Sequence, residues 1–296
     1  MTRHLLILLV GLIAQFVDGT LGMGYGASSS SMLIAAGFLP ATVSASVHAA
    51  EILASLASGV SHFRLGNVDK SITLPLTSAG VVGGVIGAYF LSNIDGRLIK
   101  PYIGLLLMIV GIKILLAFLR KKTGSDTGRG VPRKLLMPLG LIGGAVDAIG
   151  GGGWGPICTS TLISSRNSEP RTVVGSVNAA EFLVTLAITI TFAISLGLDH
   201  FLWRITLPLM IGGVIAAPLS AYICKRIAPG NLGIAIGLLL IFLNLRMVAP
   251  VLSNALGASL PVKFDVVVML AAIAVSLLMV LRSLSFRRSV SSEESR

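Results

Sequence analysis

Seven long apolar runs, almost free of charged residues, recur along this chain of 296 residues. They occupy residues 43–63, 72–91, 98–119, 172–196, 203–223, 231–248 and 262–282. Each run is close to the ~20 residues that a helix needs to cross ~30 Å of hydrocarbon. With 54% hydrophobic and only 12% charged residues, the chain is too apolar for one soluble core. The sequence therefore predicts an all-α polytopic membrane protein with seven full spans.

Two further apolar regions, 4–38 and 135–165, are each interrupted by a cluster of glycines. The first break reads DGTLGMGYG from Asp18, and the second reads DAIGGGGWGP from Asp147. The flanking pieces are expected to be about 14 residues long, or about 21 Å of helix, so that neither piece crosses a membrane alone. We expect each region to form a glycine-broken re-entrant helical hairpin.

The chain also repeats itself with a period of about 130 residues. SVHAAE at 46–51 returns as SVNAAE at 176–181, and the phrases TLPL and GLLL each occur twice in the same order. Matches in register over the whole length are not expected from shared apolar composition alone. We predict two related halves, each a hairpin followed by three transmembrane helices, with one extra C-terminal transmembrane helix.

The predicted organisation has five parts. They are a first transmembrane repeat at 1–119, a basic connector at 120–134, a second repeat at 135–249, an extra transmembrane helix within 250–284 and a polar tail at 285–296. If each glycine-broken region is a re-entrant hairpin, each repeat crosses the membrane three times. Because three is an odd number, the two repeats are then inverted relative to each other. With the connector and tail in the cytoplasm, the hairpin topology places 16 Lys and Arg residues inside and six outside. If each glycine-broken region instead crosses the membrane once, the numbers are 12 inside and 10 outside. The positive-inside rule favours the inverted arrangement, which is a common transporter plan.

The net charge of +11 belongs to short loops and tails beside apolar runs. It predicts membrane orientation and no nucleic-acid partner. Cys158 and Cys224 have no spacing partner, so neither a disulfide nor a metal site is expected. The sequence contains no nucleophile with a positioned base and no HExxH motif. We therefore expect no enzyme activity and no cofactor.

The glycine breaks are the predicted binding site. Unwound backbone at membrane depth is tolerated only where it is buried in protein or lines a wet cavity. Each break precedes a short helix whose free amides and positive dipole end favour an anion. The alternative is that the glycines only let helices pack closely. The predicted substrate-binding residues are Gly22, Gly24, Tyr25, Gly26, Ser28, Ser29, Gly151, Gly152, Gly153, Trp154, Gly155 and Thr159.

A polar stripe follows the first hairpin. Its members, spaced by three or four residues on one helix face, are Ser44, His48, Glu51, Ser55, Ser58 and His62. The second half keeps Glu181 but has Asn178 where the first has His48. Ionisable groups at membrane depth are costly and usually functional. The predicted coupling or site-bracing residues are Ser46, His48, Glu51, Ser176, Asn178 and Glu181.

Two roles remain open for the glutamates. Glu51, with His48 one turn earlier, could couple protons or gate the site. Alternatively, both glutamates accept N–H bonds from the glycine breaks and brace them, which suits an anion carrier better than a bare carboxylate beside the cargo. Asp18 and Asp147 are expected to be caps or loop braces in preference to cargo ligands. Lys113 and Arg246 either attract anions or extend toward an interface.

With the glycine breaks, the stretch ASVHAAEILASLASGVSHFRLGNVD from Ala45 and its echo at 175–197, the chain resembles the sulfite exporter TauE/SafE family of membrane permeases. The resemblance covers residues 5 to about 249. It implies movement of sulfur-containing oxyanions such as sulfite, sulfoacetate or related organosulfonates, commonly outward, across the plasma membrane. Asn178 departs from the repeat and weakens any symmetrical proton relay.

The expected function is therefore that of a secondary transporter for a small anion. Its partners would be the anionic substrate, membrane lipid, and H⁺ or Na⁺ as a coupling ion, while the oligomeric state is left open. An anion channel is the alternative, followed by a lipid scramblase or membrane enzyme. A channel would use the same breaks without a coupling group.

Overall fold

The computed structural model describes residues 2–119, 133–164, 169–224, 234, 237–245 and 248–249. The labelled helices within these ranges are α1 (Thr2–Leu21), α2 (Tyr25–Ala35), α3 (Pro40–Arg64), α4 (Lys70–Ser92), α5 (Gly96–Leu119), α6 (Arg133–Gly150), α7 (Trp154–Ser164), α8 (Pro170–Leu196), the 3-10 turn η1 (Leu198–His200) and α9 (Trp203–Ile223). Residues 237–245 are also helical. The described part of the chain is thus helical, as predicted.

Five of the predicted full spans are confirmed as helices, namely α3, α4, α5, α8 and α9, each long and apolar enough to cross a membrane. Local signals set their ends. Pro40 and Pro170 open α3 and α8 at the first turn, where the missing proline N–H costs nothing. The Asp69 side chain caps α4 by accepting from Ser71 N–H at 2.8 Å. The predicted run at 262–282 and part of the run at 231–248 lie outside the described residues.

The two helices that flank each glycine break, which we call the arms of the broken region, differ more in length than predicted. The first arms, α1 and α6, contain 20 and 18 residues, and the second arms, α2 and α7, contain 11 each. The expectation of about 14 residues per arm is wrong, and so is the statement that no arm could cross alone, because α1 meets the length and composition of a span. Helical bonding continues to Gly22, whose N–H still donates to the Asp18 carbonyl.

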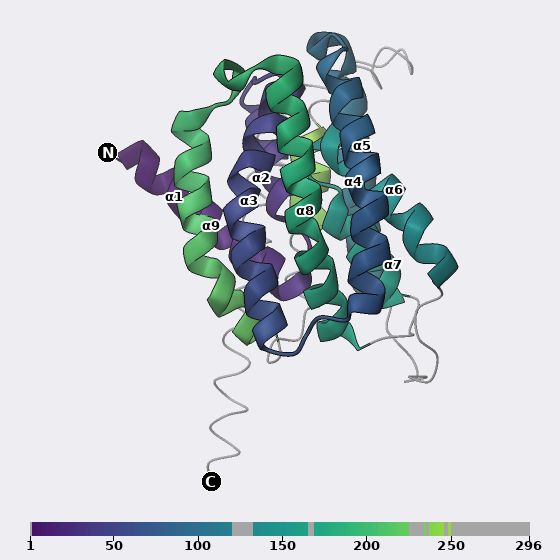
Figure 1. Ribbon diagram of the computed structural model, residues 1–296. Helices are drawn as coiled ribbons and strands as arrows, with labels where there is room; N and C mark the ends of the chain where they lie inside the picture. The colour runs from purple at the N-terminus through teal and green to yellow at the C-terminus, as the bar shows by residue number, and fades with distance from the viewer. Residues whose placement is uncertain are drawn as a thin grey trace.

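The equivalent helices α3 and α8 lie side by side (Figure 1). Helix α3 packs antiparallel to α8, since Gly59 lies against Ala179 while His48 lies near Phe192 further along. Helix α4 packs parallel to α6, and α1 packs parallel to α9. The pair α3 and α8 forms the centre of the bundle, flanked on one side by α1 and α9 and on the other by α4 and α6.

Small residues let the flanking helices approach closely, in matched positions. An ideal Cβ at Gly140 would lie 2.6 Å from the Leu76 carbonyl oxygen, and one at Gly11 would lie 2.5 Å from that of Leu209. Gly11 and Gly140 are equivalent in the repeat, as are Leu76 and Leu209. Glycine is therefore required at both places for backbone contact. This packing brings the ends of α1 and α6, and hence both breaks, into the middle of the bundle.

Candidate functional site

The two glycine breaks lie directly against each other. An ideal Cβ at Gly26 would lie 2.8 Å from the Gly151 carbonyl oxygen, and one at Gly155 would lie 2.3 Å from that of Gly22. These two contacts are equivalent in the repeat. Gly22 and Gly151 both have left-handed backbone, with φ of 69° and 68°. All residues of 21–27 and 150–156 are buried. The predicted site glycines thus form one crossing point.

Hydroxyl groups join the breaks across the halves. Thr159 Oγ1 donates to the Gly22 carbonyl at 2.7 Å, and Ser30 Oγ donates to the Gly151 carbonyl at 2.6 Å. Ser30 and Thr159 occupy equivalent positions on α2 and α7. Each half therefore satisfies a carbonyl that the other half's break leaves without a helical partner.

Thr159→Val is expected to lower the stability of the purified protein by about 1–3 kcal/mol, because the Gly22 carbonyl loses its buried donor. Ser30→Ala should have a similar effect through Gly151. Thr189→Val is the matched control, since Thr189 donates to the Thr185 carbonyl within its own helix. Melting temperatures in detergent provide the measurement. An equal loss in the control would contradict a special role for the bonds between halves.

Buried carboxylates bind the amides at the start of the short helices. Asp147 Oδ1 accepts from the N–H groups of Gly153 at 2.6 Å and Trp154 at 3.0 Å. Asp18 Oδ1 makes one long contact of 3.5 Å with the N–H of Tyr25. Asp147 therefore braces its break, as predicted.

Glu51 reaches the first break from α3. Its Oε1 lies 2.9 Å from an ideal Cβ at Gly26, so the carboxylate faces the start of α2. The expectation of free amides facing a cavity is wrong for Tyr25, Gly153 and Trp154. In a low-dielectric interior an unpaired amide costs several kcal/mol, so internal carboxylates occupy these donors.

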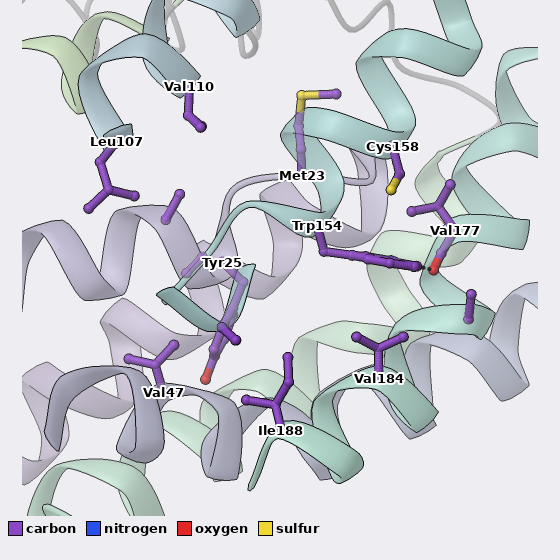
Figure 2. Close-up of a cluster of buried hydrophobic side chains, with 14 of the residues drawn as sticks. Met23, Tyr25, Val47, Leu107, Val110, Trp154, Cys158, Val177, Val184 and Ile188 are labelled. Atoms are coloured by element: carbon purple, nitrogen blue, oxygen red, sulfur yellow. Dashed lines mark hydrogen bonds between the residues drawn. The ribbon is translucent and has the colours of Figure 1, made fainter. Parts of the chain in front are cut away.

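The aromatic residues of the breaks are buried, and Trp154 points toward Val177 (Figure 2). Trp154 is fully buried, and its Nε1 donates to the Val177 carbonyl at 3.1 Å. Tyr25 is 1% exposed and lies by Val47, and its hydroxyl finds no hydrogen-bond partner among the described residues. Both rings therefore anchor the short helices to the central helices.

The predicted polar stripe on α3 is buried, and three of its members contact the other half. His48 Nε2 lies 3.2 Å from Asp147 Oδ2, and Ser44 Oγ donates to the Ala148 carbonyl at 2.6 Å. Asn178 on α8 donates to the Val174 carbonyl at 3.0 Å and accepts from Ser58 at 3.2 Å.

Glu181, the partner of Glu51 in the repeat, is 8% exposed. It interacts electrostatically with Asp18, Glu51 and Asp147. Four carboxylates from four different helices thus converge around the crossing breaks.

Five other predicted residues have more local roles. Ser46 Oγ accepts from the N–H of Leu202 at 2.8 Å, and Ser176 Oγ accepts from that of Asp69 at 2.8 Å, so both serines hold the chain where it enters α9 and α4. Ser28 Oγ donates to the Gly24 carbonyl. Ser29 is buried and its hydroxyl lacks a partner among the described residues. Gly24, with φ of 125°, caps α2.

The basic pair is only partly described. Lys113 Nζ donates to Thr161 Oγ1 at 2.9 Å and to the Ile157 carbonyl at 3.4 Å, which binds α5 to α7. Arg246 lies outside the described residues. Sequence reasoning omitted Ser30 from the candidate residues. Its position in the repeat, equivalent to that of Thr159, was the signal that could have found it.

Comparison with known proteins gives two matches. Residues 7–247 match the protein family described as Sulfite exporter TauE/SafE. The chain is 41% identical over 270 residues to the "Probable membrane transporter protein YtnM" of Bacillus subtilis (strain 168), a match that covers 87% of this chain and 90% of that protein. No solved structure matches the chain.

Proposed function

Because this chain belongs to the sulfite exporter TauE/SafE family of membrane transporters, we propose that it carries a small sulfur-containing oxyanion, sulfite or an organosulfonate such as sulfoacetate. It does so as a secondary transporter of the plasma membrane, in the direction of export. The residues that carry the cargo are those of the two crossing breaks.

The observation that carries this proposal is the set of carboxylates bound to the breaks. Asp147 accepts two amide bonds at the start of α7, and the carboxylate of Glu51 lies beside Gly26 at the start of α2. A carboxylate is itself an oxyanion, so these amides are oriented to stabilise negative oxygen. The cargo exchanges with the carboxylates, and its oxygens take over the same amides together with nearby hydroxyls such as that of Ser29.

The relation between the halves supports alternating access. The equivalent helices α3 and α8 run in opposite directions, and equivalent contacts recur between α1 and α9 and between α4 and α6. Two halves related in this way can exchange conformations, so that a site between them opens to one side and then the other. Each hairpin then enters the membrane from its own side, with the connector at 120–134 and the C-terminus cytoplasmic.

Counterflow in proteoliposomes tests the proposal. Vesicles loaded with unlabelled sulfite or sulfoacetate are expected to take up the labelled anion transiently above equilibrium, with saturable kinetics, at a mildly alkaline pH. Vesicles without protein and vesicles loaded with chloride are the controls. A channel gives labelled uptake without the overshoot, and an enzyme gives a changed product. Either result, or uptake equal to that of empty vesicles, would reject the carrier.

A further inference from the structure

His48 is fully buried on α3, and the described residues include polar neighbours of both of its ring nitrogens. Its Nδ1 lies 2.7 Å from the Ser44 carbonyl oxygen and 3.2 Å from Ser44 Oγ. Its Nε2 lies 3.2 Å from Asp147 Oδ2 on α6, and its ring is 6.4 Å from that of Phe192 on α8. Nδ1 therefore faces two oxygens of Ser44, the carbonyl being the closer, and Nε2 faces one oxygen of Asp147.

Counting donors fixes the proton on Nδ1. A carbonyl oxygen only accepts, so the 2.7 Å contact with the Ser44 carbonyl requires Nδ1 to donate. The Ser44 hydroxyl cannot supply a proton instead, because it already donates to the Ala148 carbonyl at 2.6 Å. His48 Nδ1 thus carries a hydrogen.

The contact on the other side of the ring then needs a second proton. A neutral imidazole with hydrogen on Nδ1 has a lone pair on Nε2, and this lone pair faces an oxygen of Asp147. The two atoms attract each other only if a proton lies between them. The pair holds it either as imidazolium and carboxylate or as imidazole and carboxylic acid.

We propose that the contact between His48 and Asp147 is a proton-binding site through which one proton moves together with each anion. This coupling rests on the transport function proposed above and identifies its coupling ion. The site is joined to the cargo site through one side chain, because the other oxygen of Asp147 binds the amides of Gly153 and Trp154.

Electrostatics gives the sign of the coupling. Asp147 interacts electrostatically with Asp18 on α1, Glu51 on α3, Cys158 on α7 and Glu181 on α8. Glu51 and Asp18 also act on Tyr25 of α2, while Lys113 of α5 acts on Cys158. With its proton, the pair of His48 and Asp147 has no net charge. Without it, one further negative charge repels the cargo in a medium of low dielectric constant. Proton and anion therefore bind together.

The second half has no equivalent site. Asn178 stands in the place of His48, and its two hydrogen bonds are to the Val174 carbonyl and the Ser58 hydroxyl. An amide side chain does not exchange a proton in this way. The pairing of a histidine with an aspartate therefore occurs in one half of the repeat, and it supplies one proton for each transport cycle.

The test measures protons and anions in the same proteoliposomes, which contain a pH-sensitive dye and have the membrane potential clamped by valinomycin and potassium. Sulfoacetate is the probe, because its sulfonate group carries no proton near neutral pH. The wild type is expected to acidify the lumen by about one proton per anion. His48→Asn, which copies Asn178, should bring this ratio close to zero. His62→Asn replaces a buried histidine of the same helix that bonds to Gly19 and Asn67, and it should leave the ratio unchanged.

For a variant that binds sulfoacetate but does not transport it, calorimetry gives the number of protons taken up per bound anion. Sulfoacetate is titrated into the purified protein in two buffers of different ionisation enthalpy, and the difference counts the protons taken up. His48→Gln serves if His48→Asn does not fold. Net uptake of sulfoacetate by the wild type without proton movement, or an unchanged ratio in the His48 variants, would overturn the proton site and leave the transport function intact. Absence of any wild-type counterflow would remove the transport function itself.

Discussion

Replacing Gly152 by alanine is expected to reduce anion counterflow by at least about 100-fold. An ideal Cβ at Gly152 would lie 1.8 Å from the backbone nitrogen of Ala27 and 2.2 Å from the carbonyl carbon of Gly26. These are backbone atoms of the other break, so no side-chain rotation can relieve the overlap and the breaks must separate. The initial rate of counterflow, normalised to reconstituted protein, is the measurement.

Gly150→Ala is the matched control for this prediction. An ideal Cβ at Gly150 would lie 3.4 Å from Leu106 Cδ2 and 3.5 Å from Leu107 Cδ2, which are ordinary contacts with flexible side chains. Alanine also favours the helix in which this residue lies. The control should retain a rate close to that of the wild type. An active Gly152→Ala protein would mean that the crossing of the breaks is not needed for transport.

The spans could be predicted because the bilayer imposes one simple requirement. The long apolar runs without charge coincide with five helices, namely α3, α4, α5, α8 and α9. The point at which each break begins could not be predicted in the same way. Gly19 remains helical, and an ideal Cβ there would lie 1.9 Å from Ser220 Oγ of α9. Gly19 therefore allows close packing of two helices and does not unwind its own. Only its contact with Ser220, which is distant in the sequence, distinguishes these two roles of glycine.

The candidate site was predictable in its members but not in its partners. Gly22 and Gly151, both predicted as site residues, share one backbone conformation. The duplication did not reveal that Ser30 would bind the opposite break. Nor could it show that carboxylates would occupy the amides, because Glu51 reaches Gly26 only after α2 and α3 have packed together. Contacts across the two halves depend on the fold, and local patterns do not contain them.

Asp147→Ala is expected to abolish transport and to lower the stability by several kcal/mol, whereas Asp18→Ala should be milder, although the repeat makes the two residues equivalent. Alanine at 147 leaves Gly153 N–H, Trp154 N–H and His48 Nε2 without a partner. Each buried group that loses its partner costs about 1–3 kcal/mol. Asp18 has a single long contact of 3.5 Å with Tyr25. Melting temperatures and counterflow rates of both variants provide the comparison.

Asp147→Asn separates the bracing role of this residue from its charge. The asparagine carbonyl oxygen can still accept from Gly153 and Trp154, and its Nδ2 can donate to the Nε2 lone pair of a neutral His48. This variant should therefore recover most of the stability lost in Asp147→Ala while it moves no proton with the anion. Equal losses in the alanine variants of Asp18 and Asp147 would contradict the asymmetry. An asparagine variant as unstable as Asp147→Ala would show that the charge, and not the shape of the hydrogen bonds, holds the second break.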